Sequence, residues 1–238
     1  MYMLKGQNAE TRLPILFLFG INLLAGLLFI NEGIFHYDSV ILAQAVEKTY
    51  QTGVLQPAVA GRYGSVIIAC IVYLPFYLLG QNADLAIRLS SLLSHAFSIV
   101  ALYFLVIEFF DDRRQAFIGA LLLSFMPAYF SPNTYGKEHG MSMLFLILSF
   151  YYLHRGLRKG VAWQVSASGL LYAFAVSVRE SILVLSPLLP LLYFLPEISL
   201  RPLKISLPRQ RLEPRMLLAW ILPLALCMGF MFLLYLGR

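Results

Sequence analysis

The sequence predicts an all-α membrane protein: one transmembrane domain over residues 1–238, with about seven transmembrane helices and interfacial juxtamembrane helices in its first outer loop. Of the 238 residues, 60% are hydrophobic and only 13% are charged, whereas soluble chains carry about 25% charged residues. The mean hydropathy is +0.76. In lipid only helices and closed barrels satisfy the backbone, and long continuous apolar runs favour helices.

The net charge of +6 could indicate a nucleic-acid partner, but the basic residues lie in short loops between apolar runs. That distribution is typical of membrane orientation and predicts no nucleic-acid binding. Cys70 and Cys227 lie far apart in apolar surroundings, so neither a disulfide framework nor a thiol site is expected.

Eight apolar runs follow one another along the chain, with no internal repeat between them. Runs shorter than about 20 residues need flanking residues to cross a bilayer. The runs cover residues 13–30, 64–80, 86–110, 115–131, 141–153, 161–178, 181–196 and 216–236.

The run at 64–80 decides the predicted topology. If it crosses the membrane, the basic clusters at 111–114, 154–159 and 197–215 lie opposite the N-terminus. If it lies flat in the outer interface, seven crossings remain and every basic cluster falls on the N-terminal side, as the positive-inside rule expects. We adopt this second arrangement, with a cytoplasmic N-terminus, a first outer loop over 31–86 and a basic inner loop over 197–215.

Asp38 follows the first span and precedes 39–52, a predicted short helix that Gly53 closes. The simplest role of Asp38 is the N-cap of that helix, where its carboxylate accepts hydrogen bonds from unpaired backbone N–H groups. The same carboxylate, at the outer mouth of the first span, could also act as a general base or bind a divalent cation. The two roles are compatible.

Glu138 lies in the second outer loop, between Lys137 and His139, just before the next apolar run. On its own it is a solvated acid that favours the N-terminus of the following helix. Together with Asp38 on the same side, it forms a candidate two-acid site. Two carboxylates suit a hard cation such as Mg²⁺, and His139 would also admit Zn²⁺ or Mn²⁺.

Arg179 and Glu180 lie between two apolar runs at the outer boundary. Charges near the membrane usually have partners, so a mutual or interfacial ion pair is the simplest interpretation. Alternatively, the Arg179 guanidinium could bind a lipid phosphate through two nitrogens, with Arg62 and Arg88 as further candidates. His95, inside an apolar run, is interpreted as a hydrogen-bonded packing residue.

Four stretches of the chain resemble the GT-C superfamily of membrane glycosyltransferases, nearest to its protein mannosyltransferase and aminoarabinose transferase branch. They are HYDSVILAQAVEKTYQTG, SVIIACIVYLPFYLLGQNADLAIRLSSLLS, FFDDRRQAFIGALLLSFMPAYF and the acid-bearing loop NTYGKEHG. The sequence departs from that pattern at Asp38-Ser39, where the family often has Asp-Glu. It departs again at Gly61-Arg62-Tyr63-Gly64, where a turn such as His-Pro-Pro is common.

The resemblance implies sugar transfer from a polyprenyl-phosphate donor, within the membrane lipid, to an acceptor on the extracytoplasmic side. Asp38 would act as base or orient the acceptor, and Glu138 would assist it or bind a metal. Arg62 or Arg179, with Lys137, would hold the donor phosphate. The acceptor could be a protein or a glycolipid.

Two other classes stay open. A non-catalytic membrane subunit that binds donor lipid or a partner would keep the same charged loops without turnover. A transporter or flippase would instead show matched halves and polar groups in broken mid-membrane helices, whereas here the ionisable groups gather at the outer boundary.

Overall fold

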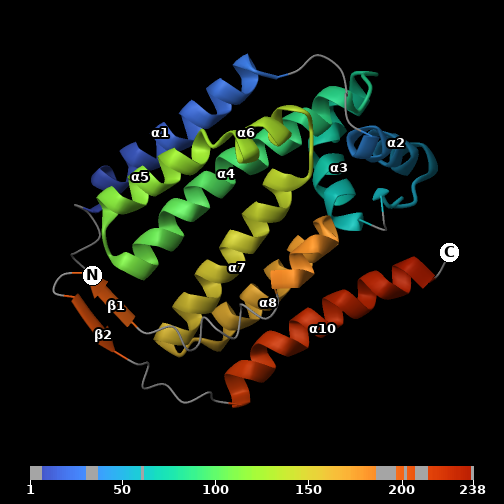
Figure 1. Ribbon diagram of the computed structural model, residues 1–238. Helices are drawn as coiled ribbons and strands as arrows, with labels where there is room; N and C mark the ends of the chain where they lie inside the picture. Colours follow the sequence, from blue (N-terminus) through green and yellow to red (C-terminus); the bar gives the residue numbers. More distant parts are fainter. Residues whose placement is uncertain are drawn as a thin grey trace.

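The computed structural model describes residues 7–30, 37–59, 62–185, 197–200, 203–206 and 214–236 (Figure 1). These residues are mostly helical. The helices are α1 (Gln7–Leu28), α2 (Tyr37–Thr52), α3 (Tyr63–Leu78), α4 (Asp84–Phe110), α5 (Arg113–Ser124), α6 (Pro127–Thr134), α7 (His139–Lys159), α8 (Ala162–Val178), the 3-10 helix η2 (Glu180–Leu185) and α10 (Pro214–Leu236).

One antiparallel strand pair departs from the all-α prediction. Strands β1 (Glu197–Leu200) and β2 (Leu203–Ser206) pair with Glu197 opposite Ser206. Both strands alternate polar and apolar residues, a period of two that suits a strand rather than a helix. The predicted basic inner loop 197–215 therefore begins with a hairpin, and its end is already part of α10.

Helix α4 is the centre of the bundle. It packs against α1, α3, α5 and α7; α7 in turn packs against α8, and α10 lies along α8 (Figure 1). The buried face of α4 carries small side chains, including Ser91, Ser94, Ala96 and Ser98. Small side chains let neighbouring helix backbones approach closely, which is the usual means of helix packing in membranes.

Large apolar side chains cover the outside of the bundle. Exposed examples lie on α1, α5 and α10, such as Leu16, Leu122 and Leu218. In water such a surface would be unfavourable, whereas in lipid it faces its natural solvent. The protein is accordingly an integral membrane protein.

By length and composition, two described helices can cross a membrane: α4 and the Pro214–Leu234 part of α10. A third span results if α5 and α6 form one bent crossing. The apolar stretches Arg12–Leu28, α3 and α8 are shorter. The seven crossings, and the placement of α3 in the outer interface, stay predictions.

The apolar run at 115–131, expected as one helix, is broken. Its two pieces, α5 and α6, meet at an angle of 56°. Met126 is extended (φ −66°, ψ 116°) and Pro127 begins α6. The residue before a proline is pushed away from helical geometry, and proline itself suits the first turn of a new helix. The sequence contained this signal, but the apolar composition concealed it.

Helices α2 and α3 lie together at one end of the bundle, which we call the site end (Figure 1). Helix α2 stops at Gly53, whose φ is +68°, which confirms its predicted end. Its start differs from the prediction: α2 begins at Tyr37, so Asp38 lies inside the first turn instead of capping it. Of the predicted run 181–196, η2 covers the first residues and the rest lies outside the described residues.

Candidate active site

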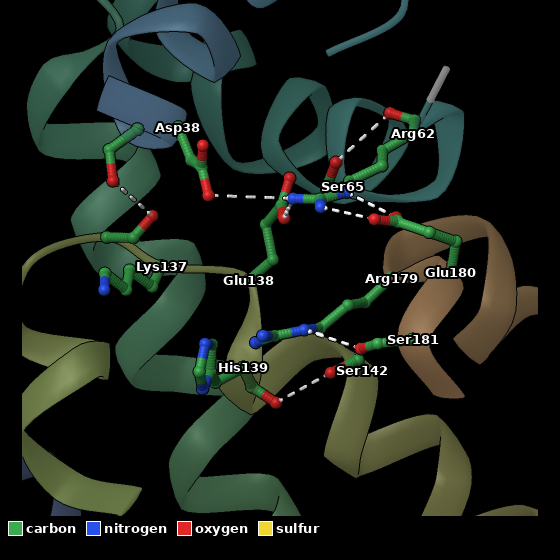
Figure 2. A network of polar contacts seen from close by, with 12 residues as sticks. Asp38, Arg62, Ser65, Lys137, Glu138, His139, Ser142, Arg179, Glu180 and Ser181 are labelled. Carbon is green, nitrogen blue, oxygen red and sulfur yellow. Dashed lines mark hydrogen bonds and ion pairs between the residues drawn. The ribbon is translucent and has the colours of Figure 1, made fainter. Parts of the chain in front are cut away.

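Three carboxylates meet around Arg62 at the site end (Figure 2). Its Nε and Nη2 each donate to a carboxylate oxygen of Glu180, both at 2.7 Å. Its Nη1 donates to Oε2 of Glu138 at 2.6 Å and lies 3.8 Å from Oδ2 of Asp38. We call Asp38, Arg62, Glu138 and Glu180 the Arg62 cluster.

Each member of the Arg62 cluster stands at the start of a helix. Asp38 is in the first turn of α2, Glu138 immediately precedes α7, and Glu180 begins η2. Carboxylates are stabilised near helix N-termini by the helix dipole. Arg62 also precedes a helix, α3, where the dipole disfavours a cation. Its position is therefore favourable only because the carboxylates surround it.

Close contact between α3 and α8 brings Arg62 to Glu180. A Cβ on Gly64 would lie 2.9 Å from the backbone nitrogen of Val178 and would overlap Ser177 Oγ. Only glycine leaves room for this approach. The end of α8, which leads directly to Glu180, can thus lie beside the start of α3.

Burial differs strongly among the three carboxylates. The side chain of Glu138 is 5% exposed, that of Asp38 38% and that of Glu180 54%, while Arg62 is 13% exposed. Glu138 and Arg62 form a buried pair, in which each charge needs the other. Asp38 and Glu180 remain open to a molecule that approaches from outside.

The electrostatics follow from this burial. Burial raises the pKa of Glu138, and the neighbouring Arg62 opposes that effect. The hydrogen bonds from Arg62 lower the pKa of Glu180, and the same contact raises the pKa of Arg62. Oε1 of Glu138 is buried with no well-oriented hydrogen-bond donor among the described residues. The Ser65 hydroxyl, which donates to the Arg62 carbonyl at 3.2 Å, is close enough to Glu138 to lower the pKa of that carboxyl.

Backbone contacts hold the loop that carries Glu138. Ser39 of α2 donates to the carbonyls of Tyr135 and Gly136 at 3.1 and 3.3 Å. Ser91 of α4 donates to the carbonyl of Lys137. Gly136 has a φ of +74°, a conformation that glycine adopts without strain. The loop is therefore tied to two helices on either side of Glu138.

A buried polar network inside the bundle also holds the loop that carries Glu138. Asn133 accepts a hydrogen bond from the backbone nitrogen of Gly140 at 2.8 Å, and its amide nitrogen contacts Nδ1 of His95 at 3.2 Å. Nε2 of His95 contacts the Asn22 side-chain oxygen at 3.1 Å, and the Asn22 amide donates to Ser124 at 2.9 Å. An amide nitrogen can only donate, so Nδ1 of His95 accepts and Nε2 carries the proton.

His95 is fully buried and hydrogen-bonded on both ring nitrogens, which confirms its interpretation as a packing residue. Asn22 and Asn133 were not predicted. Their sequence signal is an amide inside or beside an apolar run, since a buried amide needs partners. The network connects α1, α4 and α6 to the start of α7.

The structure brings Asp38, Glu138 and Arg62 together, as the two-acid hypothesis requires. Of the two ion pairs expected at that turn, the mutual one is not formed, since Arg179 makes no hydrogen bond to Glu180; Glu180 pairs with Arg62 instead. The Nε of Arg179 donates to Ser181 at 3.0 Å, and its Nη groups form no hydrogen bond or ion pair with any described residue.

The other predicted ligands of phosphate or metal lie outside the Arg62 cluster. Figure 2 shows the side chains of Lys137 and His139 pointing away from the Arg62 guanidinium. Arg88 is buried and pairs with Asp84 at 2.6 Å. Glu180 is the functional candidate that sequence reasoning missed, because its partner Arg62 lies 118 residues away and Arg179 is its immediate neighbour.

The arrangement does not fit the predicted divalent cation. The Arg62 guanidinium stands between Asp38 and Glu138, where a shared cation would have to bind. Within the described residues, no group of three or more His, Cys, Asp or Glu side chains could hold a metal ion. The cation, whether Mg²⁺, Mn²⁺ or Zn²⁺, stays a prediction and no chemical step is assigned to it.

Two comparisons with known proteins bear on this site. No curated protein matches the chain. A protein-family model described as dolichyl-phosphate-mannose-protein mannosyltransferase matches residues 65–208, which include Glu138, Arg179 and Glu180.

Proposed function

The chain belongs to the dolichyl-phosphate-mannose-protein mannosyltransferase family, whose members are membrane glycosyltransferases of the GT-C type, and on that premise we propose that it transfers a sugar from a polyprenyl-phosphate donor to an acceptor at the Arg62 cluster. The observation that carries the proposal is the convergence of Asp38 and Glu138 on one guanidinium. The match to the family begins after Asp38 and Arg62, so their roles rest on this geometry.

In the proposed reaction, Asp38 is the general base. Its carboxylate is partly open to solvent and lies 3.8 Å from Arg62, so an acceptor hydroxyl can reach it. The acceptor proton passes to Asp38 as the acceptor oxygen bonds to the anomeric carbon of the sugar. The bond from that carbon to the phosphate oxygen breaks, and polyprenyl phosphate leaves with the electron pair. Positioned bases of this kind contribute about 10²- to 10⁴-fold to a rate.

Cations stabilise the departing phosphate in this proposal. The leaving group carries its negative charge without protonation, so fixed positive charges are what it requires. Arg179 offers its Nη groups, and Arg62 offers a guanidinium that Glu138 holds in place. Lys137 points away from Arg62 and has no role in the proposed step.

A transfer assay on the purified full chain tests the function. The variant Asp38→Asn keeps size and polarity but cannot accept the proton, and we expect it to lose about 10²- to 10⁴-fold in transfer. Glu108→Gln, which removes a carboxylate paired with Arg158 at the other end of α4, is the matched control and should keep full activity. Full transfer by Asp38→Asn would contradict the mechanism.

The same preparation separates the alternatives. Donor binding without turnover would favour the non-catalytic subunit, and movement of donor lipid across vesicles would favour the flippase. Assays with and without EDTA test the predicted divalent cation. A panel of polyprenyl-phosphate sugars and of protein and glycolipid acceptors would identify the substrates.

The proposed location of the cluster is the extracytoplasmic side, and thiol labelling tests it. In a background with Cys70→Ser and Cys227→Ser, the variants Gln51→Cys and Lys159→Cys place exposed thiols near the two ends of the bundle. A membrane-impermeant reagent on intact cells should label position 51 and not position 159. The reverse pattern would put the cluster on the cytoplasmic side.

A further inference from the structure

Glu180 binds Arg62 in the way that a phosphate would. Both of its oxygens accept hydrogen bonds at 2.7 Å from Nε and Nη2, so the carboxylate occupies one complete edge of the guanidinium (Figure 2). Carboxylates and phosphates share this two-point geometry on arginine. The edge of Arg62 that a donor phosphate needs is therefore already filled.

The two carboxylates on Arg62 differ in how easily they can leave. Glu138 is 5% exposed and binds Nη1, so its departure would strand a buried charge. Glu180 is 54% exposed, and water can solvate its carboxylate as soon as it lets go. Because Glu180 is the exposed partner of this pair, another anion that offers two acceptors can take its place on Arg62 without leaving a buried charge unpaired.

Neighbouring groups also favour exchange at this edge. Arg179 adjoins Glu180 in the chain and attracts its carboxylate electrostatically. Glu138 holds Arg62 through Nη1, so the guanidinium stays in place when Glu180 departs. The site can therefore gain an anion without reorganising its buried half.

We propose that a phosphate group of the donor or of the product replaces Glu180 on Nε and Nη2 of Arg62, so that Glu180 is an internal competitor that sets the affinity for polyprenyl phosphate. The inference rests on the proposed function for the identity of the ligand. Glu180 keeps Arg62 paired while the site is empty, and its return to Arg62 assists release of the product phosphate.

Binding of a short-chain polyprenyl phosphate to the purified full chain in detergent tests the exchange without any need for turnover. Glu180→Gln loses the charge that competes for Arg62, so we expect this variant to bind about three- to tenfold more tightly than the wild type. Arg62→Lys cannot offer two coplanar donors and should bind more weakly. Glu108→Gln, which disrupts an ion pair far from the site, should bind as the wild type does.

Unchanged or weaker binding by Glu180→Gln would overturn the proposal, as would unchanged binding by Arg62→Lys. Melting temperatures without ligand verify that each variant is folded, and Glu180→Asp provides a second variant that keeps the charge but shortens its reach. The affinity of Glu180→Asp for polyprenyl phosphate should lie between that of Glu180→Gln and that of the wild type. If neither variant bound more tightly than the wild type, the exchange would again be overturned.

Two further ligands distinguish the sources of phosphate. Tighter binding of inorganic phosphate by Glu180→Gln would support exchange at the phosphate itself. Tighter binding of phosphatidic acid, but not of polyprenyl phosphate, would overturn the assignment to the donor. If Glu180→Gln bound polyprenyl phosphate more tightly but the wild type transferred no sugar, the proposed function alone would be rejected. If the wild type transferred sugar but Glu180→Gln bound no more tightly, the exchange alone would be rejected.

Discussion

The two ends of the bundle treat charged side chains in different ways. At the site end, Arg62 is 13% exposed and contacts carboxylates from α2, from the start of α7 and from η2. At the opposite end, Arg158 of α7 is 57% exposed and lies 3.6 Å from Glu108 of α4. There Asp112 simply caps α5 by accepting hydrogen bonds from the backbone nitrogens of Arg114 and Gln115.

This difference indicates which charged residues serve a function other than solubility and orientation in the membrane. In the pair of Arg158 and Glu108 the carboxylate is 15% exposed, but the arginine is 57% exposed, so water solvates its charge and the pair needs less from the fold. A buried guanidinium among carboxylates costs desolvation, and the chain maintains it with contacts that join residues 76 and 118 positions apart. Perturbed, partly buried charges of this kind concentrate at functional sites.

The largest expected difference between the two ends comes from removing each arginine. Arg62→Ala leaves Glu138 buried beside no cation, so we expect a loss of about 3–5 kcal/mol in the free energy of unfolding. Arg158→Ala removes an exposed arginine from a longer contact of 3.6 Å and should cost less than about 1 kcal/mol. Denaturation in detergent, followed by circular dichroism, measures both, and equal losses would show that the Arg62 cluster is no more buried than the opposite end.

A smaller loss of stability is expected from Asn133→Ala, which disrupts the buried hydrogen-bond network beside Glu138. Asn133→Ala leaves Nδ1 of His95 and the nitrogen of Gly140 without their partner, which should cost about 1–3 kcal/mol. We expect transfer activity to fall further than the folded fraction does, because the loop with Glu138 loses its support.

Ser149→Ala is the matched control for Asn133→Ala. Ser149 is buried and hydrogen-bonds to Ser168 at the contact between α7 and α8, away from the site. Its loss should lower stability by about 1 kcal/mol and leave the activity of the folded protein unchanged. If both variants lost activity only in proportion to their folded fraction, the network would have no positioning role.

The smallest expected difference concerns two glycines with positive φ. Gly136, at the site end, and Gly160, after α7, have φ values of +74° and +64°. Alanine at either position should cost about 1–2 kcal/mol because of its Cβ. At Gly136 that Cβ would also lie 3.0 Å from Ile87, whereas at Gly160 nothing lies within 4 Å. Thermal unfolding should therefore rank Gly136→Ala below Gly160→Ala; the opposite order would contradict the tight packing of the loop.

Much of the fold was predictable because apolar composition determines membrane helices. The runs at 64–80 and 86–110 became α3 and α4 with nearly the predicted bounds. The run at 141–153 was predicted too short, because α7 continues through the basic residues to Lys159 and Gly160 caps it. Arginine and lysine are good helix formers and suit a helix C-terminus, so polarity there did not mean a loop.

The site was predictable only in part. Asp38 and Glu138 could be paired because both fall in loops assigned to the same side of the membrane. The partner of Glu180 could not be derived, since local reasoning favours its neighbour Arg179 over a residue 118 positions away. Nor could the burial of Glu138 be predicted, because a loop acid at a helix start is ordinarily solvated.

The central claim is that the donor headgroup binds at the site end, and photo-crosslinking tests it most directly. The exposed aromatic residues Tyr37, beside Asp38, and Trp163, at the start of α8, can each be replaced by benzoylphenylalanine. The length of α8 separates the two ends by about 25 Å, beyond the reach of a two-isoprene donor. With a donor labelled in its sugar, we expect crosslinking from position 37 and not from position 163. Crosslinking from position 163 alone would contradict the account and move the site to the opposite end.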